Sequence, residues 1–274
     1  MLDVQDAAHV TIDPSILYFG TPVVLVSTVG ADGRPNLAPL SSIFWLGHTA
    51  VIGVGARSQT AINLRETGEV VLNLPSVEQV SAVDRIALTT GRDPVSARKS
   101  SVGYRYEPDK FGRAGLTPVG SDTVSAPRAG ECPVHLEGRV VDVHALRGDD
   151  PVAAGSILAV EIAVTRVHVH ESIRLAGSAH RIDPDRWRPL IMSFQQFYGL
   201  GDRVLPSRLS TIDEEWFRCS ASAGPSCSSS PSWSISPGGR GLPATAGSQQ
   251  MGRSHGRCPA PGGERTPSGS LRTG

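Results

Sequence analysis

The chain has 274 residues, with 26 basic and 26 acidic side chains and a formal net charge of zero at pH 7. This balance argues against a nucleic-acid-binding surface and against a polybasic membrane patch. The start, MLDVQDAAHVTIDP, lacks the basic and apolar regions of a signal peptide, and no run of 18 apolar residues occurs. We therefore expect a cytoplasmic protein that neither enters a membrane nor binds nucleic acid.

The composition changes sharply near Arg218. Residues 219–274 are rich in Ser, Gly, Pro and Arg and nearly lack aliphatic side chains. Such a segment cannot bury enough apolar surface to offset its chain entropy, so we expect a disordered tail. The expected organisation is an N-terminal extension (residues 1–14), one domain (residues 15–218) and this tail. Of the four cysteines only Cys132 lies in the expected domain, where we interpret it as a reduced, buried thiol.

The first part of the domain predicts β-strands and one helix. The run VVLVSTV is β-branched, and Asp32-Gly33 after it is a hairpin turn signal. Ser58 suits a helix N-cap, and Thr67-Gly68 suits the end of that helix. The strands expected here are Val23–Val29, Asn36–Leu46, Ala50–Val54 and Glu69–Leu74.

The second part predicts short helices and two long strands. Residues 91–130 are rich in Pro, Gly and charge, and because so long a bare loop is unusual, we expect them to cover a site in part. Helices are expected at Ser76–Leu88, Pro94–Ser101, Pro108–Ala114 and Pro184–Ile191. Long strands are expected at Pro133–Leu146 and Ser156–Val169. About six antiparallel strands with glycine-rich turns favour a closed β-barrel with peripheral helices.

Two neighbouring segments carry polar groups suited to one ligand. In RPNLAPLSSIF, Asn36, Ser41 and Ser42 suit the alternating donors and acceptors of a flavin ring, although a half-buried strand with surface serines is the alternative. In GVGARSQTAIN, a strand leads through a turn into a helix, whose free N–H groups suit a phosphate. Arg57 adds a positive charge, although an ordinary capped helix is the alternative. The third glycine of a dinucleotide-binding fingerprint is absent.

Together these segments resemble the flavin reductase-like, FMN-binding split-barrel family. The resemblance rests on N-x-A-P-x-S-S-x-F followed by R-S-x-T-x-x-N-x-x-x-T-G, and it runs from about Ser15 to Arg218. It implies a mainly β fold with peripheral helices, a six-stranded antiparallel Greek-key split barrel, and a homodimer with FMN near the subunit boundary. It implies that Asn36, Ser41, Ser42, Ile43 and Phe44 lie along the ring and ribityl chain, and that the phosphate is held by Arg57, Ser58, Gln59 and Thr60.

The resemblance also implies an NAD(P)H-dependent oxidoreductase. Electrons would pass from a nicotinamide through FMN to oxygen, a partner oxygenase or a small substrate, and the chain offers no identifiable catalytic residue of its own. Many reductases of the family carry Gly-Asp-His where this chain has Gly155-Ser156-Ile157. One alternative is therefore an FMN-binding protein without efficient turnover. Another is a related split-barrel oxidase or deazaflavin-dependent reductase.

Several other residues have a chemical and a plain interpretation. His168 and His170 are two apart on an expected strand and His144 lies on its neighbour, so three imidazoles could bind a metal. We favour surface or subunit-contact histidines and predict no metal site. The aromatics of Gln195–Gly199 suit core packing or stacking on a ring.

Overall fold

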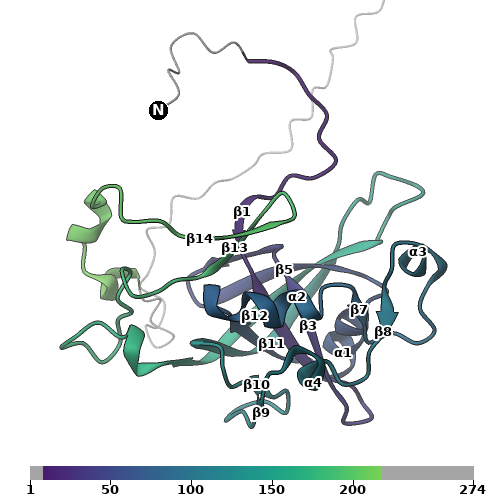
Figure 1. Ribbon diagram of the computed structural model, residues 1–274, viewed down its shortest axis with the longest axis horizontal. Helices are drawn as coiled ribbons and strands as arrows, with labels where there is room; N and C mark the ends of the chain where they lie inside the picture. Colours follow the sequence, from purple (N-terminus) through teal and green to yellow (C-terminus); the bar gives the residue numbers. More distant parts are fainter. Residues whose placement is uncertain (1–8, 218–274) are drawn as a thin grey trace, which may run out of the picture. The chain divides into compact units, whose positions relative to one another are not determined.

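The structure, a computed structural model, describes residues 9–217, and the fold is mainly β (Figure 1). Its principal strands are β2 (Val24–Val29), β3 (Pro35–Leu40), β4 (Ile43–Leu46), β5 (Thr49–Gly55), β6 (Glu69–Leu74), β11 (Val134–Ala145) and β12 (Ile157–Val169). They form one antiparallel sheet in the order β3-β2-β6-β11-β12-β5-β4. The mainly β class and the expected strand positions are confirmed, except that one predicted strand is divided.

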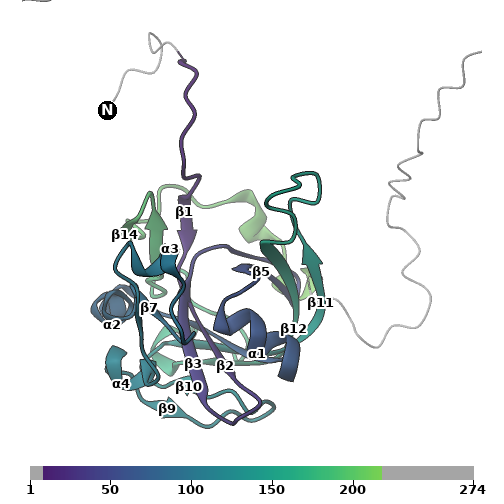
Figure 2. The ribbon, with the colours of Figure 1, turned by 90° about the vertical axis from the view of Figure 1, so that its right-hand side faces the viewer.

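The sheet closes into a barrel because its two edge strands are consecutive in the chain. Only Ser41 and Ser42 separate β3 from β4, and such a link spans less than about 11 Å. The sheet therefore curls until its edges approach, as the strands around α1 show in Figure 2. A hydrogen bond of 2.8 Å from the Gly53 amide to the Ser42 carbonyl extends the pairing of β4 with β5 into this link.

The prediction of one continuous strand over Asn36–Leu46 is wrong. The chain leaves the sheet at the two serines and rejoins it at the opposite edge, so the sheet has seven strands where six were expected. Pro39 has no amide hydrogen to donate, which suits an edge strand. Periodicity did not reveal the break because the residues on both sides are apolar.

Strand β2 is buried on both faces. Val24 and Val26 pack into the barrel interior, whereas Leu25 packs into a second, outer core. This explains why the strand is a continuous β-branched run instead of an alternating one. The outer core also contains Cys132, whose burial raises the pKa of its thiol to about 12. The expectation of a buried free thiol is confirmed.

Helix α1 (Gln59–Thr67) closes one end of the barrel. Ala61 and Leu64 belong to the inner core. The Ser58 hydroxyl accepts a hydrogen bond from the Ala61 amide at 3.1 Å, and Gly68 ends the helix with φ 67°. The predicted cap and C-terminus are therefore confirmed. A side-chain hydrogen bond from Asn63 to Thr28 attaches the helix to β2, and a bond from Gln59 holds the Asn63 side chain within the helix.

The other helices lie outside the barrel. A capping box between Ser76 and Gln79 begins the first of them. They are η2 (Val77–Gln79), α2 (Val80–Arg85), α3 (Ala97–Ser100), α4 (Lys110–Ala114), η3 (Glu171–Ile173), η4 (Arg208–Thr211) and η5 (Glu214–Phe217). Of these, η2, α2, α3 and α4 fall within the predicted segments, whereas η3, η4 and η5 were not predicted. Within the described residues, no helix is both long and apolar enough to cross a membrane.

The short strands were mostly not predicted. They are β1 (Phe19–Pro22), β7 (Thr89–Thr90), β8 (Arg105–Tyr106), β9 (Pro118–Val119), β10 (Arg128–Ala129), β13 (Leu190–Ser193) and β14 (Gln196–Gly199). The expected helix Pro184–Ile191 is wrong. Residues 184–186 form a turn directly after Asp183. Leu190 begins strand β13, and its carbonyl accepts a hydrogen bond of 2.8 Å from the amide of Val23, which lies between β1 and β2. Most of the expected N-terminal extension and the tail lie outside the described residues.

Candidate functional site

A pocket of about 380 Å³ opens where β3, the end of β5 and the start of α1 meet. Residues 87–110, which include β7, β8 and α3, form its other wall, as the expectation of a partial cover anticipated. The lining consists of Tyr18, Val26, Asn36, Ala38, Pro39, Leu40, Ser42, Gly53, Val54, Gly55, Ser58, Gln59, Thr60, Ala87, Thr89, Thr90, Gly91, Lys99, Tyr104, Lys110 and Ile157. The volume is in the range of small-molecule and cofactor sites.

Asn36 links β3 to the start of α1 inside this pocket. Its side chain is 6% exposed, and its Nδ2 donates to Thr60 Oγ1 at 3.1 Å. Its Oδ1 is buried and has no hydrogen-bond partner among the described residues. An unpartnered buried acceptor costs free energy. The Asn36 oxygen is therefore suited to a ligand that supplies an N–H.

The β3–β4 link contributes a second polar group. Ser42 Oγ lies 3.0 Å from Tyr18 Oη, and both residues line the pocket. Tyr18 immediately precedes β1, so it was not part of either predicted ligand segment. A hydroxyl pair can both donate and accept, which suits a heterocycle edge with alternating functions.

Lys110 gives the pocket a buried positive charge. Its side chain is 5% exposed and makes no hydrogen bond or ion pair with any described residue. Burial and the neighbouring Lys99 charge lower the pKa of Lys110 to about 8. None of the described residues that line the pocket is an Asp or a Glu. The pocket is therefore suited to an anion.

The predicted site residues fall into two groups. Asn36, Ser42, Ser58, Gln59 and Thr60 all line the pocket. Four others lie outside its lining: Ser41, Ile43, Phe44 and Arg57.

The alternation of a strand explains the difference within β4. Ile43 points into the inner core and is 7% exposed, whereas Phe44 is 52% exposed. Arg57 is exposed and makes no hydrogen bond or ion pair with a described residue. The structure thus brings together the polar groups of both segments, but not every side chain in them.

The residues that sequence reasoning missed come mainly from the covering wall: Thr89, Thr90, Gly91, Lys99, Tyr104 and Lys110. The available signal was the unusual length of the irregular segment. Lys110 is the first residue of α4, directly after the Asp109 N-cap. Tertiary packing of α4 against the barrel, which no local pattern shows, brings Lys110 to the pocket. Ile157, which the family resemblance singled out, does line the pocket.

The histidines occupy separate places. His144 Nε2 lies 2.8 Å from Glu161 Oε1 near one end of β11, whereas His168 contacts Glu137 at 2.7 Å nearer the other. His170 follows β12 and caps η3. The prediction that His168 and His170 share a strand face is therefore wrong, because β12 ends at Val169, between them.

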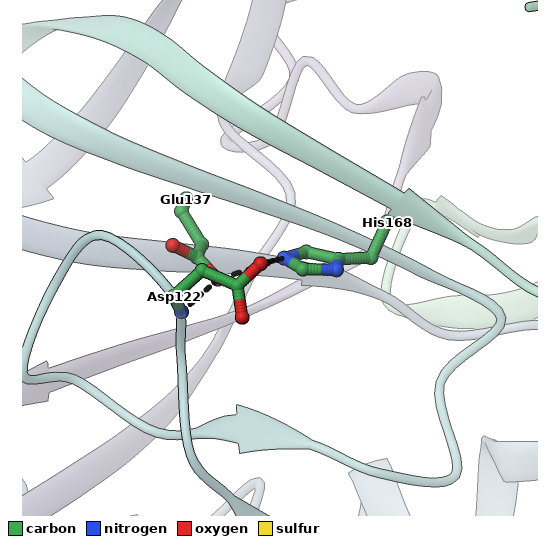
Figure 3. Close-up of side chains that lie close together, drawn as sticks. All are labelled: Asp122, Glu137 and His168. Atoms are coloured by element: carbon green, nitrogen blue, oxygen red, sulfur yellow. Dashed lines mark hydrogen bonds and ion pairs between the residues drawn. The ribbon is translucent and has the colours of Figure 1, made fainter.

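Figure 3 shows Asp122, Glu137 and His168, whose potential ligand atoms lie within 4.8 Å of one another. The Glu137 carboxylate already accepts from the Asp122 amide, from the amide and hydroxyl of Thr123, and from His168. These bonds fasten the loop before β10 onto β11 and β12. The cluster therefore has a structural explanation.

The aromatics of β14 are not part of the pocket. Phe197 packs against the outer core, and Tyr198 is exposed. Of the two interpretations, core packing is therefore the one that Phe197 follows.

Comparisons with known proteins agree with this geometry. A sequence profile described as "Flavin reductase like domain" matches residues 16–201. The uncharacterized protein YdfE of Bacillus subtilis is 36% identical over 193 residues, covering 70% of this chain and 90% of that protein. The solved flavoredoxin of Desulfovibrio vulgaris (Miyazaki F) has a TM-score of 0.59 at 20% identity, covering 75% of this chain and all of the other (100%). Nitrilotriacetate monooxygenase component B from Bacillus cereus has a TM-score of 0.58 at 21% identity, with 73% and 100% covered. The two solved structures show the shared fold, and the profile, which matches most of the domain, shows that this chain belongs to the flavin reductase-like family.

Proposed function

We propose that the protein is an FMN-binding oxidoreductase of the flavin reductase type, with NAD(P)H as its electron donor. The observation that carries this proposal is the pocket itself. It combines amide and hydroxyl groups from β3, β4 and α1 with a buried, unpaired lysine, and its described lining has no carboxylate. A polar wall without a described carboxylate and with a buried lysine suits a flavin ring carrying a phosphate.

Three features of the pocket fit FMN. The unpartnered Asn36 Oδ1 offers an acceptor to a ring N–H. The unpaired Lys110 ammonium offers a counter-charge to the phosphate. Gly91 allows close approach, because a Cβ there would lie 2.5 Å from Asn36 Oδ1. When bound, FMN would supply the hydride-accepting and electron-transferring chemistry.

The residues of the two predicted segments would then divide the cofactor between them. Asn36 and Ser42 would hold the ring, with Ser41 of the β3–β4 link and Ile43 and Phe44 of β4 contributing through their backbone. Ser58, Gln59 and Thr60 at the start of α1 would hold the phosphate with Lys110, and Arg57 would approach it from the surface. Electrons would leave to oxygen, a small substrate or a partner oxygenase.

A second candidate function is FMN binding without efficient reductase turnover. Ile157 lies in the pocket wall, at the position where the family resemblance leads us to expect a histidine. An isoleucine cannot donate a hydrogen bond or a proton to a nicotinamide or to the ring. NADH and NADPH oxidation assays with added FMN distinguish the candidates, because only a reductase turns over many times per bound cofactor.

We also expect a homodimer. Phe44 and Leu46 on β4 are exposed beside the pocket-forming link, and Phe19 packs edge-on against Phe194 at 4.7 Å on a largely exposed face. Exposed apolar groups of this kind are typical of interaction surfaces. Light scattering at micromolar concentration with FMN bound should give twice the chain mass, and a monomer mass would contradict the expectation.

The first test of the proposal is a titration of FMN fluorescence. We expect saturable quenching with a dissociation constant of about 1 μM or below, which corresponds to about 8 kcal/mol of binding. Riboflavin should bind more weakly because it lacks the phosphate. Absence of saturation up to about 1 mM FMN, or about 4 kcal/mol, would refute FMN binding. Mass spectrometry of the retained cofactor tests a deazaflavin in the same preparation.

Gly91→Ala should weaken FMN binding about tenfold while the fold is kept. The added Cβ would lie 2.5 Å from Asn36 Oδ1 and 3.3 Å from Gln59 Cβ, so Asn36 has to leave its place against the ligand. A lost hydrogen bond of ordinary strength corresponds to about that factor. Gly120→Ala is the control, because its Cβ would meet no heavy atom within 4 Å. Equal FMN affinity in both variants would remove Asn36 from the proposed site.

A further inference from the structure

Lys99 stands at the pocket in a fixed position that the proposed cofactor contacts do not use. It lies on α3, and its ammonium nitrogen is 5.1 Å from the centre of the Tyr104 ring. The Tyr104 amide also donates to the Lys99 carbonyl at 3.1 Å, which ties the two residues together through the backbone. Both residues line the pocket. The stacked tyrosine therefore restricts where the lysine charge can lie.

The Lys99 charge has no acidic partner. The described residues give it no ion pair, and the pocket lining contains no carboxylate among them. The covering wall, residues 87–110, carries five basic side chains, Arg92, Arg98, Lys99, Arg105 and Lys110, against three acidic ones, Asp93, Glu107 and Asp109. A wall with a net positive charge raises the local concentration of anionic ligands.

The depths of the two lysines separate their roles. Lys110 is buried at 5% exposure, whereas Lys99 is only half-buried. Lys99 is nevertheless near enough for its charge to help lower the pKa of Lys110. A cofactor that fills the interior would neutralise Lys110 and leave Lys99 at the rim, facing whatever enters next.

We propose that Lys99, held over Tyr104 at the rim of the pocket, binds a phosphate or carboxylate group of the second substrate and so selects anionic electron donors or acceptors. The proposal rests on the proposed function, because the second substrate meets a pocket already holding FMN. The shared chemistry is an anionic oxygen group that the ammonium contacts directly. Its source is either a phosphate of a pyridine nucleotide or the carboxylate of a small aromatic acid.

Binding to the FMN-loaded protein tests this without turnover. The probes are ADP-ribose, which carries the pyrophosphate of a pyridine nucleotide, benzoate, and benzamide as the neutral counterpart of benzoate. Each is titrated by calorimetry into wild type, Lys99→Met and Arg98→Met. Arg98 is the matched control because it is exposed on the same helix and does not line the pocket.

Lys99→Met should weaken at least one anion about tenfold, as expected for a charge-assisted hydrogen bond at a partly exposed site. Benzamide should be unaffected, and Arg98→Met should change either anion less than about threefold because an exposed charge is screened. Loss for ADP-ribose alone identifies the phosphate source, and loss for benzoate alone identifies the carboxylate.

Three results would overturn the inference. The first is a holoprotein that binds neither anion. The second is an anion affinity that Lys99→Met leaves unchanged or that Arg98→Met lowers equally. The third is a Lys99→Met variant that loses affinity for FMN but not for riboflavin, because Lys99 would then hold the cofactor phosphate. A wild-type protein that binds no FMN overturns the proposed function as well, so the two failures are distinguishable.

Discussion

Lys110→Met should weaken FMN about ten- to a hundredfold and riboflavin less than about threefold. The Lys110 ammonium is buried and forms no ion pair with a described residue, and Glu107 acts on it only through its charge, so a phosphate would be its first directly bonded counter-charge. A hydrogen bond to a charged group contributes about 1.5–3 kcal/mol, and methionine keeps the shape of the chain while removing the charge. Fluorescence titration of both flavins on both proteins measures the selectivity. Equal losses for the two flavins would place Lys110 against the ring.

The loss of FMN affinity in Arg57→Ala should be compared with the loss in Lys110→Met. Arg57 is exposed, and exposed ion pairs contribute less than buried ones. We therefore expect it to lower FMN affinity by about three- to tenfold, with little change for riboflavin. A larger loss than for Lys110→Met would show that the surface guanidinium, and not the buried ammonium, holds the phosphate.

The same lysine predicts a pH dependence. Burial and the Lys99 charge hold the pKa of Lys110 at about 8, below its ordinary value of 10.5. FMN should bind with constant affinity from pH 7 to about 8 and more weakly above, because the free protein loses the Lys110 proton there. Folded protein binds fewer protons than unfolded protein between the two pKa values, so the free energy of unfolding without FMN should rise over that range. In Lys110→Met, neither the FMN affinity nor the free energy of unfolding should show this dependence on pH.

Glu137→Gln should lower the free energy of unfolding by about 3 kcal/mol at pH 7. Glu137 is fully buried, and each carboxylate oxygen accepts two hydrogen bonds, from Asp122, Thr123 and His168. A glutamine presents an NH₂ group to two of these donors and removes the charge, and breaking one side of a buried charged network costs about 3–5 kcal/mol. Urea unfolding measures the loss.

Glu131→Gln is its control, because that exposed carboxylate accepts comparable bonds from Thr117. We expect a loss below about 1 kcal/mol there. A similar loss in both variants would mean that burial of the Glu137 network contributes nothing.

Acid should remove the difference between wild type and Glu137→Gln. Burial acts to raise the pKa of Glu137, but the hydrogen bonds from Thr123, Asp122 and His168 prevail and hold it at about 2. Since the pKa is lower in the folded state, the stabilisation is complete above about pH 4.5 and is lost as the pH falls towards 2. Unfolding at pH 7 and at pH 3 therefore should give a smaller difference at pH 3.

The sequence by itself determined the positions of most principal strands, of helix α1, and of one polar part of the pocket lining. The β-branched run of β2, the Ser58 cap and the Gly68 stop depend on neighbours in the chain, and the structure confirms each of them. Asn36, Ser42 and Thr60 were recognisable because two strands and a helix start that are adjacent in the chain also lie adjacent in the barrel.

Only the tertiary structure decided the rest of the fold and of the pocket. The break at Ser41-Ser42 depends on barrel closure, and the turn where Pro184–Ile191 was expected to be helical depends on pairing between Leu190 and Val23. Lys99 and Lys110 are more than 40 residues from the first pocket segment, and no local pattern distinguishes them from surface lysines. What distinguishes them is their burial and the lack of an ion pair with any described carboxylate, which are properties of packing and not of sequence spacing.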